Sequence, residues 1–143
     1  EWSETLMSPQ AVGWDWIGMN LHDGSALTAF RLRDSAGRTL WAGGSWRDKS
    51  GKLLAFAQDE VKFEAQRPWK SPSSQASYPV EWKLATPAGR FAVKALLDDQ
   101  ELDSRGSTGT IYWEGLSDLL DERGQAVGRG YLEMTGYAGK LKL

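Results

Sequence analysis

Tyrosine and glutamate side chains alternate in two segments near the end of the chain. Residues 112–115 are Tyr-Trp-Glu-Gly, and residues 130–137 are Gly-Tyr-Leu-Glu-Met-Thr-Gly-Tyr. In a β-strand, alternate residues point to the same face, so the tyrosine and glutamate of each segment share a face. If antiparallel pairing joins these faces inside the protein, Glu114 and Glu133 lie in an aromatic pocket. Burial raises the pKa of a carboxyl group and suits it to general acid catalysis.

The sequence leaves open the direction in which this face points. An outward direction fits equally well, because Leu132 and Met134 form an apolar face that would make a core on its own. In the inward arrangement, Arg31 and Arg33, which share a face of an earlier strand, are expected to pair with the carboxylates. The predicted catalytic residues are Glu114 and Glu133.

Two tryptophans flank an aspartate near the start of the chain. Trp14 and Trp16 share one strand face, while Asp15 lies among apolar residues on the other. The indole rings would either line a cavity for a flat or apolar ligand or fill the core at one end of the fold. A buried Asp15 needs a hydrogen-bond partner, which favours a structural role. The predicted ligand-binding residues are Trp14, Trp16, Arg31, Trp82, Tyr112, Tyr131 and Tyr137.

Other residue patterns indicate no further chemistry. The acidic stretch 98–103 has oxygen ligands suited to calcium, but its spacing differs from an EF-hand and favours a solvated loop. The single histidine, His22, follows a strand at a turn and is expected to be exposed. Without cysteine the chain has no thiolate ligand or thiol nucleophile. We therefore predict no metal and no cofactor.

Composition places the chain among ordinary globular domains. Its 143 residues make a single domain, 1–143, and eight tryptophans accompany sixteen glycines. The formal net charge of −2 argues against non-specific nucleic-acid binding, which needs excess basic charge. No apolar run is long enough for a transmembrane helix, and the sequence as given has no signal-peptide pattern.

Glycine-containing turns separate segments with alternating apolar residues, a pattern typical of antiparallel β-structure. We expect eight strands and an all-β, up-and-down, lipocalin-like barrel, because closure removes exposed sheet edges. A two-sheet β-sandwich is the alternative. A phase change near 58–59 predicts a bulge in the fourth strand, and 67–77 are expected to be a crossover. The predicted strands are 12–21, 26–33, 39–47, 53–64, 78–85, 90–97, 110–119 and 125–137.

A series of short motifs runs through nearly the whole chain. They are Glu-Trp-Ser (1–3), Gly-Trp-Asp-Trp-Ile-Gly (13–18), Phe-Arg-Leu-Arg-Asp (30–34), Trp-Ala-Gly-Gly (41–44), Ser-Pro (71–72), Tyr-Pro-Val-Glu-Trp (78–82), Asp-Gln-Glu-Leu-Asp (99–103), Tyr-Trp-Glu-Gly (112–115) and the segment 130–137. Their ordered combination resembles the C-terminal half of the AttH and carotenoid 1,2-hydratase-like proteins. The resemblance implies a lipocalin-like (calycin) barrel that packs against an N-terminal sister barrel, and a periplasmic or cell-envelope location.

Three functions are compatible with these observations. The first is a module that binds a hydrophobic small molecule, such as a lipid or isoprenoid, in a barrel lined by tryptophan and tyrosine. The second, implied by the resemblance, is a hydratase, lyase or isomerase that needs the sister domain, with Glu114 or Glu133 as proton donor and Tyr112 or Tyr131 orienting it. The third is a structural half-domain whose interface with the sister barrel includes Trp2, Trp41 and Trp69.

Overall fold

The structure is a computed structural model that describes residues 10–107 and 109–139; Trp2 lies outside them. In this part of the chain, strands dominate and the one helical element is a short 3₁₀ turn, η1 (Gln58–Glu60). No helix in these ranges is long and apolar enough to cross a membrane. The strands are β1 (Gly13–Leu21), β2 (Ala26–Arg33), β3 (Thr39–Arg47), β4 (Leu53–Phe56), β5 (Lys62–Ala65), β6 (Pro68–Lys70), β7 (Ser77–Pro79), β8 (Glu81–Thr86), β9 (Gly89–Ala95), β10 (Glu101–Asp103), β11 (Ile111–Leu120) and β12 (Ala126–Met134).

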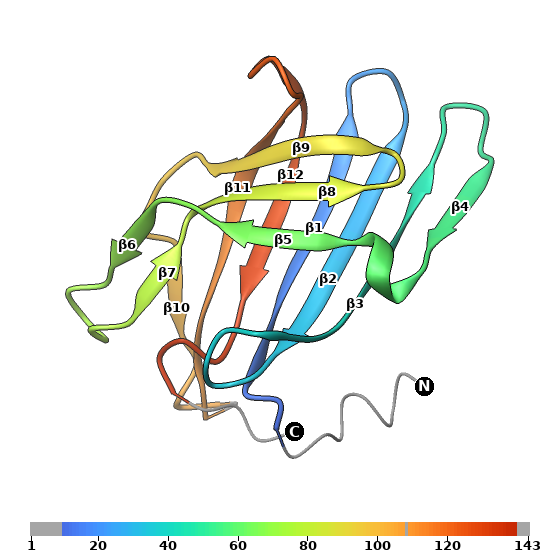
Figure 1. Cartoon of the computed structure of the whole chain (residues 1–143). Coiled ribbons are helices and arrows are strands. Elements are labelled where there is room, and N and C mark those ends of the chain that lie inside the picture. The colour runs from blue at the N-terminus through green and yellow to red at the C-terminus, as the bar shows by residue number, and fades with distance from the viewer. Residues whose placement is uncertain (1–9, 108, 140–143) are drawn as a thin grey trace.

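The strands form one large antiparallel sheet that bends over itself into two layers. Its order is β4-β3-β2-β1-β12-β11-β9-β8-β5, with β10 also paired to β11, and β6 and β7 form a separate ribbon. Figure 1 shows β5, β8 and β9 crossing in front of β12, β1 and β2. The all-β antiparallel prediction is confirmed, but the prediction of an eight-stranded closed barrel is wrong. The ten-stranded sheet stays open because its two end strands, β4 and β5, do not pair with each other.

The break between β4 and β5 explains why closure fails. The sequence predicts one strand over 53–64 with a bulge near 58–59, and a kink does occur there. It is a full 3₁₀ turn, so β4 pairs with β3 while β5 pairs with β8 in the other layer. The predicted crossover 67–77 contains the β6 strand and leads into β7.

Large rings fill the space between the two layers. Trp82, Trp113 and Tyr78 are almost completely buried, together with aliphatic residues from both layers such as Ile17 and Leu119. A filled interior of this kind stabilises the fold through packing and leaves the sheet no need to close. The predicted single strand 78–85 is wrong in one respect, because the chain divides at Val80 into β7 and β8, which belong to different sheets.

Glu101 in β10 fastens the loop between β6 and β7 to the sheet. Its carboxylate accepts hydrogen bonds from the hydroxyls of Ser71, Ser74 and Tyr78 over 2.5–2.7 Å. Burial by itself would raise the pKa of Glu101, but the three hydroxyl donors lower it below the ordinary value of 4.5. The acidic stretch 98–103 is therefore held in part by hydroxyl groups.

The lowered pKa of Glu101 makes a share of the stability depend on pH. The folded state favours the ionised carboxylate, so this stability is fully present above the unfolded pKa of 4.5 and is lost as pH falls through the folded pKa. We expect Glu101→Gln to cost about 1–3 kcal/mol at pH 7. The difference between the native protein and this variant should shrink below pH 4.5, as measured by urea unfolding from pH 7 to pH 3. A difference that is constant with pH would contradict the assignment.

Candidate functional site

Asp15 lies at the centre of a buried cluster of charged side chains. Strand alternation turns it inward from β1, and the register places it opposite Arg31 of β2. Its carboxylate is fully buried, 2.8 Å from Arg31 Nε and 3.3 Å from Arg33 Nη1. The partner that the sequence required for a buried Asp15 is thus a pair of arginines. The expectation that Arg31 and Arg33 pair with Glu114 and Glu133 is wrong.

Tyr137 completes this group, which we call the Asp15 cluster (Asp15, Arg31, Arg33 and Tyr137). Its hydroxyl donates to Asp15 Oδ1 over 2.7 Å, and the Arg33 guanidinium carbon lies 3.7 Å from the centre of its ring. Burial, and then the charge of Asp15, raise the pKa of Tyr137, so the phenol stays protonated as a donor. Tyr137 faces inward because β12 ends at Met134 and Gly136 has a φ of +82°, which breaks the alternation.

Arg31 links the cluster to the second layer of the sheet. Its guanidinium carbon lies 5.1 Å from the centre of the Trp82 ring and 5.9 Å from that of Phe63. It also donates to Thr39 Oγ1 over 3.1 Å. The Trp82 Nε1 atom is buried and, within the described residues, has no hydrogen-bond partner. Of the residues predicted to bind ligand, the structure therefore brings together Arg31, Trp82 and Tyr137.

A surface pocket of about 490 Å³ opens beside this cluster. Arg33 and Tyr137 form part of its wall, so two cluster members reach the pocket directly. We call it the Arg33 pocket. Its other lining residues are Val12, Asp34, Ser35, Ala36, Gly37, Gly136 and Gly139.

The tyrosine–glutamate face points away from the core, so the inward arrangement is wrong. Glu114 of β11 lies opposite Glu133 of β12, but Tyr131 on the same face is 51% exposed. The opposite face, with Leu132 and Met134, is fully buried. Leu132 and Met134 face the core in place of the tyrosines and glutamates because apolar side chains can be buried without hydrogen-bond partners.

The remaining predicted residues gather on this outer face. Trp14 and Trp16 are half-buried there, and Trp14 Nε1 donates to Glu133 Oε1 over 2.8 Å. Tyr112 is half-buried one strand further on, opposite Leu102 of β10. These side chains do not line the space between the layers.

Glu114 is the candidate proton donor on the outer face. Burial, and then the charge of Glu133, raise its pKa above the ordinary value of 4.5. A carboxyl group beside a second carboxylate, with a raised pKa, suits proton donation. The outer face therefore holds a second, more exposed candidate for chemistry.

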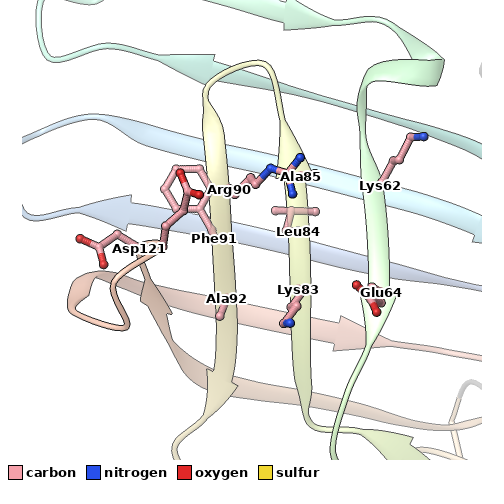
Figure 2. A pocket seen from close by; sticks show the side chains of 10 residues that line it. Lys62, Glu64, Lys83, Leu84, Ala85, Arg90, Phe91, Ala92 and Asp121 are labelled. Atoms are coloured by element: carbon pink, nitrogen blue, oxygen red, sulfur yellow. The ribbon is translucent and has the colours of Figure 1, made fainter.

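A second pocket, of about 460 Å³, lies over β5, β8 and β9. Figure 2 shows Lys62, Glu64, Lys83 and Arg90 around it, with Asp121 at its edge. Its charges have both signs, and most belong to exposed side chains. Unlike the Arg33 pocket, it has no buried charged cluster beside it among residues 10–107 and 109–139.

Of the predicted site residues, Arg31, Trp82 and Tyr137 turn inward as expected, whereas the others lie on the outer face, and the partner of the arginines is Asp15. Asp15 had been assigned a structural role, and Arg33 was not among the predicted ligand-binding residues. The signal was present in the pattern: an aspartate on an apolar face, and two arginines on one face of the next strand. Pairing β1 with β2 as neighbours in a hairpin would have joined them.

The comparison with protein families identifies one family for this chain. Residues 1–137 match the AttH-like family, whereas none of the curated proteins compared matches the chain. An AttH-like protein of Nitrosomonas europaea has a similar structure, with 46% identity and a TM-score of 0.86. The similarity covers 92% of this chain and 41% of that one.

A more distant similarity is to kievitone hydratase from Nectria haematococca. The identity is 19% and the TM-score 0.67, over 90% of this chain and 40% of that chain. At this identity the likeness shows a shared fold. The chain thus spans about two-fifths of the length of both proteins.

Proposed function

The chain belongs to the AttH-like family, and we propose that it is the part of such a protein that binds a small organic molecule with an apolar body in the Arg33 pocket. The observation that carries the proposal is the meeting of that pocket with a buried charged cluster. Binding sites for small molecules are concave, mostly apolar and supplied with a few fixed polar groups.

The dimensions and the support of the pocket favour this function. Its volume of about 490 Å³ lies within the range typical of small-molecule sites. Asp15 holds Arg33 and Tyr137 in place from below, so both side chains are fixed before a ligand arrives. A preorganised site loses less conformational entropy on binding. The ligand proposed here lies at the end of the two layers, outside the filled core.

Two similar turns provide a variant and a matched control. In each, an aspartate Oδ1 accepts backbone N–H bonds from the residues two and four positions later: Ala36 and Arg38 after Asp34, and Ser50 and Lys52 after Asp48. Ala36 lines the Arg33 pocket, whereas Ser50 does not. Both side chains are exposed. The two turns match in position and backbone hydrogen bonding, but Ser50 Oγ also donates to Asp48 Oδ1, a bond that its substitution removes and that Ala36 lacks.

We expect Ala36→Trp to narrow the pocket and Ser50→Trp to leave it open. The probe is N-phenyl-1-naphthylamine, a neutral apolar dye whose fluorescence rises on binding. The native protein and Ser50→Trp should bind it alike, and Ala36→Trp about tenfold more weakly, a difference of roughly 1.4 kcal/mol. No binding by the native protein would overturn the proposed function. Equal binding by all three would overturn the assignment to this pocket.

The Glu114–Glu133 pair favours a second candidate function. In a hydratase-type reaction, Glu114 would protonate a double bond of an isoprenoid-like ligand held on the outer face. Water would then add to the resulting carbocation and return its extra proton to the Glu114 carboxylate. The raised pKa of Glu114 and the name of the distant structural neighbour, kievitone hydratase, support this candidate. The aromatic outer face would also suit contact with a sister domain. The two similar structures, which are more than twice as long as the matched region, have room for such a domain.

This candidate predicts a specific titration. Glu114 should titrate above 4.5 in an NMR pH series of the native protein. Glu133→Gln removes the neighbouring negative charge, so the pKa of Glu114 should fall but stay above 4.5, because burial is the larger cause. If the pKa of Glu114 in the native protein is at or below 4.5, the assignment of Glu114 as the proton donor is wrong.

A further inference from the structure

We propose that the Arg33 pocket selects ligands whose apolar body carries a carboxylate. This inference rests on the proposed function and names the class of molecule that the pocket takes. It starts from a charge count. The Asp15 cluster contains two guanidiniums, of Arg31 and Arg33, and a single carboxylate, and all three side chains are buried. Tyr137 stays neutral, so the cluster carries one uncompensated positive charge.

The charged groups around the pocket do not cancel this excess. Asp34 lines the pocket, but its Oδ1 accepts two backbone N–H bonds of its own turn. Its Oδ2 accepts from Arg38 Nε over 3.0 Å, so this pair is neutral by itself. Within the described residues, Asp15 is the carboxylate paired with Arg31 and Arg33. A buried charge is costly unless it is paired, and a bound anion would pair the remaining one.

Hydrogen bonding leads to the same conclusion. Arg33 donates to Asp15 and to the backbone oxygen of Thr135, and its face lies on the Tyr137 ring. A guanidinium has more N–H donors than these acceptors use. Under Arg31, the indole N–H of Trp82 is buried with no acceptor in the described part of the chain. Trp82 does not line the Arg33 pocket, so the guanidinium donors open to a ligand in that pocket belong to Arg33.

A carboxylate fits these conditions better than a neutral or doubly charged group. It brings one negative charge, which matches the excess of one, and planar oxygens that suit a guanidinium. Besides Arg33 and Asp34, the pocket is lined by Ser35 and by the largely apolar group of Val12, Ala36, Tyr137 and glycines. Such a wall favours an apolar body attached to the carboxylate.

The experiment compares ligands that share a tail and differ in charge. Decanoate and decanol are titrated into the native protein by calorimetry at pH 7.5. Acetate, which has the carboxylate but no apolar tail, is the control. The variants are Ala36→Glu, which adds a negative charge at the pocket, and Ser50→Glu, which adds it in the matched turn. We expect decanoate to bind the native protein about tenfold more tightly than decanol. Ala36→Glu should remove this preference, and Ser50→Glu should retain it.

Each remaining outcome separates the two proposals. If decanoate and decanol bind equally, the carboxylate inference is wrong while the proposed function stands. If neither decanoate nor decanol binds, both the proposed function and the carboxylate inference are wrong. A preference for decanoate that survives in Ala36→Glu would place the carboxylate elsewhere and overturn the inference. If acetate binds as tightly as decanoate, the inference that the pocket binds the apolar part of the ligand is wrong.

Discussion

Asp15→Asn is expected to lower the free energy of unfolding by about 3–5 kcal/mol, the cost of removing one partner from a buried ion pair. The substitution keeps the shape of the side chain but removes its charge. Arg31 and Arg33 then remain largely buried without a carboxylate partner, although Arg33 also lines the surface pocket. Tyr137 also loses the charged acceptor of its hydroxyl.

The matched control is Asp118→Asn. Asp118 pairs with Arg129 over 2.9 Å, nearly the same distance as Arg31 to Asp15, but the Arg129 side chain is 55% exposed. Exposed pairs contribute about 0–1 kcal/mol, because water screens them. Urea unfolding of both variants at pH 7 makes the comparison. If Asp15→Asn does not fold, Tyr137→Phe, which removes one hydroxyl, should still show a loss of about 1 kcal/mol. Equal small losses for both aspartates would refute the burial argument.

Gly130→Ala is expected to be the most damaging of the glycine-to-alanine substitutions in β1 and β12, because its added methyl group would meet the closest backbone atom. Gly130 of β12 lies opposite Met19 of β1. A methyl group there would overlap the backbone oxygen of Gly18 and approach the Cα of Met19 to 2.8 Å. Because backbone atoms cannot rotate away as a side chain does, β1 and β12 must separate. We expect a loss near or above the upper end of roughly 1–3 kcal/mol for overpacking.

The effect should also reach the Arg33 pocket. β1 carries Asp15 and β12 leads directly to Tyr137, so a changed register between them moves the two sides of the cluster apart. Binding of N-phenyl-1-naphthylamine should therefore weaken together with stability. Gly106→Ala is the control, because nothing lies within 4 Å of the added methyl group. A Gly130→Ala protein as stable as this control would contradict the close strand approach.

Local alternation determined much of the fold. Strands β1, β2 and β3 lie within one residue of their predicted positions, because glycine turns punctuate long alternating segments. The pattern also located the kink after β4. Strand β10 was missed because its acidic residues have low β-propensity. It forms where β11 offers an edge and where hydroxyls from a distant loop bind Glu101.

For the site, alternation identified pairs of faces but not their direction. It placed Glu114 with Tyr112 and Arg31 with Arg33, and both groupings occur. It did not reveal that Tyr137 leaves the face of Tyr131, since that depends on the strand ending at Met134. Both interpretations of Trp14 and Trp16, as cavity lining or as core, placed them in the interior, whereas they are half-buried on the outer face.

The amino-acid sequence by itself determined the all-β class, the first strands, the family resemblance and the need of Asp15 for a partner, because these depend on residue spacing along one strand or one hairpin. The tertiary structure alone decided that the sheet stays open, that Leu132 and Met134 face the core, and that Arg33 and Tyr137 meet beside a pocket. Those outcomes depend on contacts between segments far apart in the chain, such as Tyr137 with Asp15. These long-range contacts determine which side chains are buried and which buried polar groups find hydrogen-bond partners.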